Sequence, residues 1–169
     1  VSDCAGVKAE GWREWTPIGN TDDGYSGTFD GNGYTISGLY IKELRVFNIG
    51  IFGMLMGGTV KSLGLINSYI EGCEYVGGIA GNIDGSSIIS NCYNAGTVSS
   101  AANDRQNYGG ICGYIVDKGS KVTDCYNTGK VNRKTDYNTI GGIVGWNIGE
   151  VTNCYILDND TYTSAAGGG

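Results

Sequence analysis

The residue types that could support catalysis form an incomplete set in this sequence. The chain has 169 residues, with 17 acidic side chains and six cysteines but no histidine. Without histidine, serine–histidine and cysteine–histidine mechanisms and the His-Glu-x-x-His zinc motif are excluded. A glycosidase or lyase mechanism would need two or three carboxylates on one face. The acids do not recur at matching positions of the repeats described below, except Asp124, which asparagine replaces on either side. We therefore expect no enzymatic activity.

Three cysteines share one position of an internal repeat, which predicts buried free thiols rather than disulfides. Cys92, Cys125 and Cys154 stand where an earlier repeat has Leu63, and Cys112 stands where other repeats have phenylalanine, alanine or valine. Positions that accept such residues are core positions, where a free cysteine behaves as a small hydrophobe. No Cys-x-x-Cys occurs, so we expect no zinc site. Two cysteines lie outside the pattern, and a disulfide between them stays open: Cys4 and Cys73.

A tyrosine follows each cysteine of the shared position, at Tyr93, Tyr126 and Tyr155. Side chains alternate along a strand, so these rings are expected to point outward and to stack as an exposed aromatic ladder. Such a ladder could bind sugar faces or a partner protein. The alternative is that the tyrosines only stabilise successive rungs by cross-strand pairing.

Polar segments of variable length separate the repeats and are expected to project from one edge as loops, at 71–76, 99–108 and 132–140. Insertions of this kind often form a binding face. They carry Arg105, Arg133 and Lys134, which could contact an acidic glycan or carboxylates of a partner, or could simply be solvated loop charges.

Calcium is the one ion that the carboxylates suggest, although no cofactor is expected. Oxygen ligands occur at Asp22-Asp23 and at Asp158-Asn159-Asp160. Neither group has the full ligand spacing of a calcium loop, so ordinary turn carboxylates are the alternative.

The elements that must position these residues come from a degenerate repeat of 28–32 residues. A Gly-Ile-x-Gly unit recurs four times, at 50–53, 78–81, 110–113 and 142–145. A second unit follows each one, for example Val122-Thr123-Asp124-Cys125-Tyr126-Asn127, and a third apolar position closes three repeats. The segments are short, rich in β-branched and aromatic residues, and bounded by Gly, Asn or Asp, which is typical of strands. We expect an all-β solenoid with about three short strands per coil.

In such a solenoid the equivalent apolar residues of successive coils share one core. The expected core ladder consists of Leu63, Cys92, Cys125 and Cys154, with Ile51, Ile79, Ile111 and Ile143.

Asparagines are expected at the corners of the coil. Asn94-Ala95-Gly96 and Asn127-Thr128-Gly129 read as turns, because Asn and Gly tolerate left-handed dihedral angles. The residues at 91, 124 and 153 are Asn, Asp and Asn. Their side chains are expected to hydrogen-bond along the coil axis, with separate Asx turns as the alternative.

The composition of the chain limits the classes of partner that are expected. The net charge of −6 and the pI near 4.5 argue against nucleic acid as a main partner. No run of eighteen apolar residues is present, so no membrane insertion is expected. The chain starts at Val1 without a signal-peptide pattern and ends in three glycines, which suggests a piece of a longer protein.

The repeats resemble the GLUG motif repeats of bacterial surface proteins, which also occur beside IgA-cleaving metallopeptidase domains. The resemblance rests on Gly78-Ile79-Ala80-Gly81 with Asn91-Cys92-Tyr93-Asn94-Ala95-Gly96 and their later copies, and covers roughly residues 12 to 156. Segments 15–19 and 27–39 look like the coil that usually precedes such repeats. The resemblance implies a right-handed parallel β-helix and an extracellular, adhesin-like setting.

We therefore expect an N-terminal cap with the opening coil at 1–45, β-helix repeats at 46–156 and an irregular C-terminal tail at 157–169. The expected function is that of a non-catalytic bacterial cell-surface or secreted module that binds a host or microbial surface glycan or protein. One alternative is a structural spacer, or a fibre subunit that associates with itself end to end. Another is an accessory domain that presents substrate to a surface peptidase.

Overall fold

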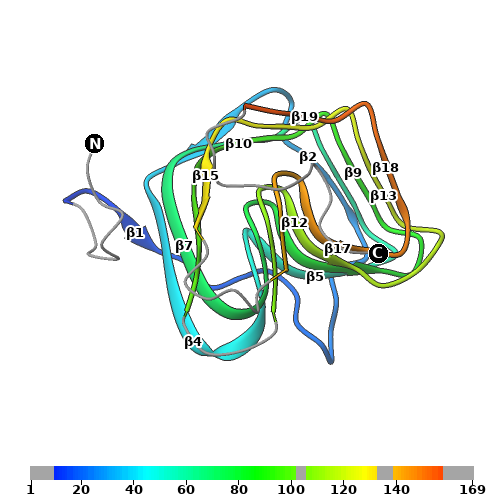
Figure 1. Ribbon diagram of the computed structural model, residues 1–169, viewed down its shortest axis with the longest axis horizontal. Coiled ribbons are helices and arrows are strands. Elements are labelled where there is room, and N and C mark those ends of the chain that lie inside the picture. The colour runs from blue at the N-terminus through cyan, green and yellow to red at the C-terminus, as the bar shows by residue number, and fades with distance from the viewer. Residues whose placement is uncertain (1–9, 102–105, 133–138, 158–169) are drawn as a thin grey trace.

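The chain forms a parallel β-solenoid, as the repeat predicts. The structure is a computed structural model that describes residues 10–101, 106–132 and 139–157. Its strands pair in parallel within three sheets, and Figure 1 shows the coils lying over one another. Within the described ranges, no helix has the length and apolarity needed to cross a bilayer.

The coils contribute strands to three sheets, and within the described residues only the first coil has no strand in the four-stranded sheet. The first, here called the long sheet, contains β1 (Arg13–Glu14), β3 (Thr35–Ser37), β4 (Leu39–Ile49), β7 (Gly64–Gly77), β10 (Tyr93–Ser100), β11 (Asn107–Gly109), β14 (Tyr126–Asn127), β15 (Lys130–Asn132), β16 (Thr139–Gly141) and β19 (Tyr155–Ile156). The four-stranded sheet contains β5 (Phe52–Met56), β8 (Ala80–Asp84), β12 (Cys112–Ile115) and β17 (Val144–Asn147). The five-stranded sheet contains β2 (Thr28–Asp30), β6 (Thr59–Lys61), β9 (Ile88–Ser90), β13 (Lys121–Thr123) and β18 (Glu150–Thr152). We number the coils one to five by these last five strands.

A sharp corner joins the five-stranded sheet to the long sheet. At this corner Asn91, Asp124 and Asn153 have φ values of 51°, 54° and 52°. Asn and Asp adopt this left-handed conformation more readily than other residues with a Cβ. The recurring Asn or Asp before each cysteine therefore sets the turn that brings the cysteine inward and the tyrosine outward.

The Gly-Ile-x-Gly units form the opposite turn, between the long sheet and the four-stranded sheet. The isoleucines stack there, since the N–H of Ile79 donates to the oxygen of Ile111 and the N–H of Ile111 donates to that of Ile143, each at 2.9 Å. The second glycine of the unit is required by close approach of the chain: a Cβ on Gly81 would overlap the backbone of Asn48.

The core is the column of side chains enclosed by the three sheets. The structure buries the whole isoleucine set of the expected ladder, together with Leu63, Cys92 and Cys125, while Cys154 in coil five is partly buried. Asn94 and Asn127 are also completely buried.

The prediction that 71–76 projects as a loop is wrong, because these residues lie inside β7 and pair with β4 on one side and with β10 and β11 on the other. Their side chains are buried or half-buried in the strand, and Glu71 is only 3% exposed. Glu71 is held there by the hydroxyl of Tyr69, which donates at 3.1 Å, and by the ammonium of Lys42 at 3.4 Å.

The described ends of the other two expected loops belong to strands. Ser99 and Ser100 belong to β10, and Tyr108 in β11 is fully buried. Of 132–140, Asn132 ends β15 and the last two residues start β16. The cations expected to bind a partner, Arg105, Arg133 and Lys134, lie outside the described residues.

The turns expected at 94–96 and 127–129 are also different from the prediction. Neither Asn94 nor Asn127 has a positive φ. Asn94 lies inside β10, next to an irregularity in its pairing with β7, and Asn127 ends β14. Both side chains turn into the core instead of forming a surface turn.

Candidate binding surface: the tyrosine column

The three predicted tyrosines form one column on the outside of the solenoid. Tyr93 pairs with Tyr126 and Tyr126 pairs with Tyr155 in the register of β10, β14 and β19. The rings of Tyr93 and Tyr126 are stacked, with centroids 4.8 Å apart and planes 2° apart. The exposed fraction of the side chain increases along the column. Tyr93 is partly buried, Tyr126 is 43% exposed and Tyr155 is 73% exposed.

A glycine of the preceding coil leaves space for Tyr93, the first ring of the column. Tyr93 pairs with Gly64 of the preceding coil, and a Cβ on Gly64 would overlap the ring of Tyr93. Tyr93 is thus enclosed between the backbone of one coil and the ring of the next. The stacking leaves mainly ring edges and phenol hydroxyls at the surface, and the broadest accessible aromatic area is that of Tyr155.

A polar column runs beside the rings, two residues earlier in each coil. The amide of Asn153 donates to Oδ1 of Asp124 at 3.2 Å. The hydroxyl of Thr123 donates to the other oxygen of Asp124 at 2.9 Å, and the hydroxyl of Thr152 lies 3.3 Å from that of Thr123. The predicted hydrogen bonding along the coil axis is therefore present between coils four and five, at residues that also make the corner. Sequence reasoning identified the corner residues but did not assign them to the same surface as the tyrosines.

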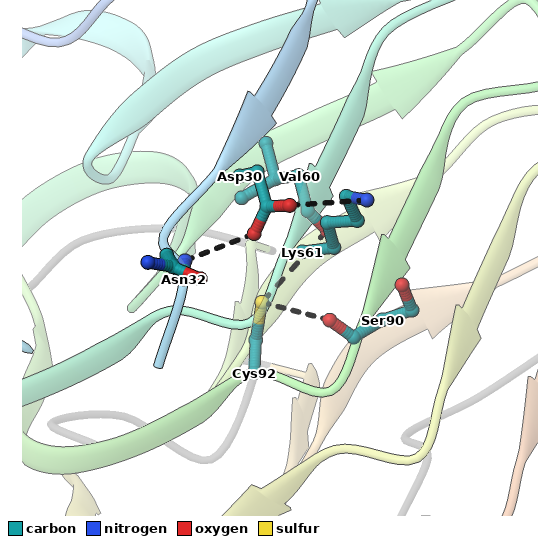
Figure 2. A network of polar contacts seen from close by, with 6 residues as sticks. All are labelled: Asp30, Asn32, Val60, Lys61, Ser90 and Cys92. Carbon is teal, nitrogen blue, oxygen red and sulfur yellow. Dashed lines mark hydrogen bonds and ion pairs between the residues drawn. The ribbon is translucent and has the colours of Figure 1, made fainter. Parts of the chain in front are cut away.

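The cysteines occupy the inner side of the same corner. The thiol of Cys92 lies 3.2 Å from the oxygen of Ser90 and 3.8 Å from that of Val60 in the preceding coil, as Figure 2 shows. Cys125 repeats the local contact, at 3.1 Å from the oxygen of Thr123. Each thiol thus contacts a backbone oxygen of its own turn. Such a contact suits a small, weakly polar side chain.

The other described cysteines are free thiols in different surroundings. Cys112 is buried in the four-stranded sheet, and burial raises its pKa to about 12. Cys73 is partly buried, its thiol lies 3.3 Å from the oxygen of Val46, and burial raises its pKa. The suggested partner Cys4 lies outside the described residues.

An ion pair marks the first coils on the face next to the column. The ammonium of Lys61 lies 3.1 Å from Oδ2 of Asp30, and the N–H of Asn32 donates to Oδ1 of Asp30 at 2.9 Å (Figure 2). The hydrogen bond from Asn32, followed by that from Lys61, lowers the pKa of Asp30. The carboxylate thereby fixes the turn between β2 and β3.

The first pair of acidic residues suggested for calcium, Asp22-Asp23, lies in a turn. Asn20 accepts hydrogen bonds from the N–H groups of Asp22 and Asp23, at 2.8 and 3.0 Å. Among the described residues, no group of three or more acidic or thiol side chains is arranged to hold a metal ion. The second suggested calcium site, Asp158-Asn159-Asp160, lies outside the described residues.

A second aromatic set on another side of the solenoid was missed from the sequence. Tyr114 pairs with Trp146 in the four-stranded sheet, and the ring of Tyr75 from the long sheet lies 5.1 Å from that of Tyr114. Tyr114 and Trp146 both directly follow the second glycine of a Gly-Ile-x-Gly unit, which was the available signal.

Comparisons with known proteins agree with the repeat. The family model of the GLUG motif matches residues 72–99, which run from β7 to β10, and residues 104–132, which end with β15. Halomucin of Haloquadratum walsbyi is 37% identical over 105 residues, which are 61% of this chain and 1% of halomucin. A Gly-rich membrane protein of Evansella cellulosilytica is 39% identical over 72 residues, which are 40% of this chain and 8% of that protein. The chain thus spans a small part of both relatives, and no solved structure matches it.

Proposed function

We propose that this chain is a non-catalytic module of a cell-surface or secreted protein and that it binds a glycan or protein through the tyrosine column. The proposal starts from the GLUG motif repeats and the parallel β-solenoid that they form. Support for a surface location comes from the two relatives, one of which is described as a membrane protein. Support for a non-catalytic role comes from the sequence, which has no histidine and no acidic pair repeated from coil to coil.

One observation supports the binding role: a tyrosine column that is exposed at Tyr126 and Tyr155 lies beside hydrogen-bonding side chains of the adjacent corner. The Tyr126 and Tyr155 rings provide apolar area, and the amide of Asn153 and the carboxylate of Asp124 provide polar groups one corner away. Binding sites combine apolar aromatic area with a few fixed polar groups. A polyhydroxylated sugar chain running along the coil axis would meet both kinds of group at each rung.

The accessible end of the column decides where contact is expected. The ring of Tyr93 is enclosed by Gly64 and Tyr126, so it has little area to offer. Tyr155 is the most exposed of the three, and we expect it to contribute most to binding.

The test is a glycan-array and surface-protein binding screen of the chain, followed by titration of any ligand with variants. Tyr126→Ser with Tyr155→Ser should weaken binding at least tenfold. Tyr34→Ser is the matched control, because Tyr34 is also 73% exposed but lies in coil one. Equal affinity of the double variant and the wild type would refute a binding role for the column.

Three cations of the predicted loops are a separate proposed contact for an acidic partner. Arg105, Arg133 and Lys134 depart from the acidic trend of the chain. Changing all three to serine should weaken binding of an anionic glycan and make the remaining binding less sensitive to salt, with no change in melting temperature. Unaltered binding would remove these residues from the proposal.

A second candidate function, a rigid spacer, is favoured by the unbroken register of the sheets. Strands of the five-stranded sheet pair rung by rung from β2 to β18. If the module also stacks end to end, sedimentation velocity should show association that increases with concentration. A monomer at all concentrations would leave a spacer without self-stacking.

A further inference from the structure

The cysteines of coils four and five are neighbours in space. Tyr126 and Tyr155 are paired, and the N–H of Tyr155 donates to the oxygen of Cys125 at 3.0 Å. Cys154, which directly precedes Tyr155, therefore lies on the rung next to Cys125. Adjacent strands are roughly 4.8 Å apart, which is within the range of about 4.4–6.8 Å between the Cα atoms of disulfide-bonded cysteines.

The two thiols differ in access to solvent. Cys125 is 1% exposed, whereas Cys154, in coil five, is only partly buried. A reagent dissolved in water should therefore reach Cys154 first. The adjacent Cys125 thiol lowers the pKa of Cys154, which increases the thiolate fraction of Cys154 at neutral pH.

We propose that Cys154 is a peroxide-reactive thiol and that Cys125 resolves its oxidation into a disulfide between coils four and five. The oxidant is a hydroperoxide. The Cys154 thiolate attacks the terminal oxygen, the O–O bond breaks and an S–O bond forms. The sulfur is oxidised by two electrons to sulfenic acid, and the peroxide is reduced to water or an alcohol after taking up a proton.

The second step consumes the neighbouring thiol. The sulfur of Cys125 attacks the sulfenic sulfur of Cys154, an S–S bond forms and the S–O bond breaks. The proton of Cys125 leaves with the hydroxide as water. The product joins two successive coils covalently, so we expect a higher melting temperature after oxidation. This inference does not depend on the tyrosine column binding a ligand.

The experiment treats the whole chain with hydrogen peroxide at low protein concentration and maps the products by mass spectrometry. The expected product has lost two hydrogens and contains a Cys125–Cys154 linked peptide. Cys73 serves as an internal reference, because it is also partly buried but its pKa is raised by burial. Alkylation of the reduced chain should modify Cys154 faster than Cys73.

Two variants separate the steps. Cys125→Val keeps an apolar side chain at a position where coil two has Leu63, and it should stop at a sulfenic acid on Cys154 that dimedone traps. Cys154→Ser should form no disulfide under the same treatment. Circular dichroism checks that both variants are folded. The proposal is overturned if the folded wild type gives no Cys125–Cys154 linkage, gives only intermolecular disulfides, or if Cys73 reacts faster than Cys154.

Discussion

Asn94 donates its side-chain amide to the amide oxygen of Asn127 at 3.1 Å inside the core, where both residues are completely buried. Each amide oxygen also accepts the backbone N–H two residues later, from Gly96 at 2.8 Å and from Gly129 at 3.1 Å. The pair therefore connects coils three and four and stabilises the bend of the long sheet in each of them. A polar pair with these partners satisfies buried donors and acceptors that the bend in the long sheet would otherwise leave open.

Replacing one member of this pair should be costly. Asn127→Ala removes an acceptor from Gly129 and leaves the amide of Asn94 without its partner, so we expect the free energy of unfolding to fall by about 2–4 kcal/mol. Urea unfolding followed by circular dichroism measures this. Thr128→Ala, at the neighbouring exposed position, should cost less than about 0.5 kcal/mol.

Replacing both members tests whether hydrogen bonding is the cause. The same column has Leu65 before Asn94 and Ile156 after Asn127, so apolar side chains occur at equivalent positions. Asn94→Leu with Asn127→Leu should cost less than the sum of the two single leucine variants, because no amide is left unpaired in the double variant. Additive costs would argue against the pair as a unit.

This asparagine pair also shows which features can be predicted from the sequence and which cannot. The Gly-Ile units and the Cys-Tyr units predict the coil, the three faces, the buried isoleucines and the tyrosine register, because each depends on local periodicity. The sequence of Asn94 to Gly96 predicts a turn because Asn and Gly tolerate left-handed dihedral angles. The burial of Asn94 depends on Asn127 and Gly78 of other segments, which pack against it only after the coils have stacked.

The error at 71–76 has a related cause. Glu71 and its neighbours are polar, and the sequence cannot distinguish a polar loop from a strand whose polar residues have partners in adjacent coils. The strand follows from the pairing of Glu71 with Lys42 on one side and Ser99 on the other. The polar column beside the tyrosines was missed for the same reason, since Asp124 and Asn153 meet only across coils.

The first glycine of the Gly-Ile-x-Gly unit should be among the least replaceable residues. A Cβ on Gly110 would overlap the side chain of Asn127 and the backbone oxygen of Gly142, and backbone in adjacent coils cannot move aside. We expect Gly110→Ala to lower the free energy of unfolding by more than about 3 kcal/mol or to prevent folding. Gly33→Ala is the comparison, because its φ is +78° but no atom lies within 4 Å of the added Cβ. Its cost should stay near 1 kcal/mol, as expected for backbone strain alone. Similar costs for the two variants would contradict the packing explanation.

The tyrosine column should contribute to stability as well as to binding. The parallel rings of Tyr93 and Tyr126 predict a coupling energy of about 0.5–1.5 kcal/mol in a double-mutant cycle with alanine. Unfolding of the two single variants and the double variant in urea measures it. A coupling near zero would show that the stack does not hold the rungs together and would leave recognition as the reason for the column.

Tyr69 should make the fold sensitive to alkaline pH. Burial, and secondarily the nearby Glu71 carboxylate that accepts its hydroxyl, raise the pKa of Tyr69 to about 12. The phenol of an unfolded chain has a pKa near 10. Below pH 10 the phenol is protonated in both states, so its contribution to stability is fully present. Between about pH 10 and pH 12 the unfolded chain releases the proton while the folded chain keeps it, so the free energy of unfolding falls by at most about 1.4 kcal/mol per pH unit.

Tyr69→Phe separates this contribution from those of other groups. At about pH 8 the variant should be less stable than the wild type by roughly 1 kcal/mol, because the hydrogen bond to Glu71 is lost. At about pH 11 the difference should shrink or reverse, because phenylalanine has no proton to lose. Urea midpoints measured at both pH values give the two differences. Tyr75, whose pKa is also raised to about 12 by burial, is unchanged in the variant, so a remaining alkaline loss of stability is expected. An identical loss in the variant and the wild type would show that Tyr69 stays un-ionised in both states, or ionises equally in both, and would contradict the burial explanation.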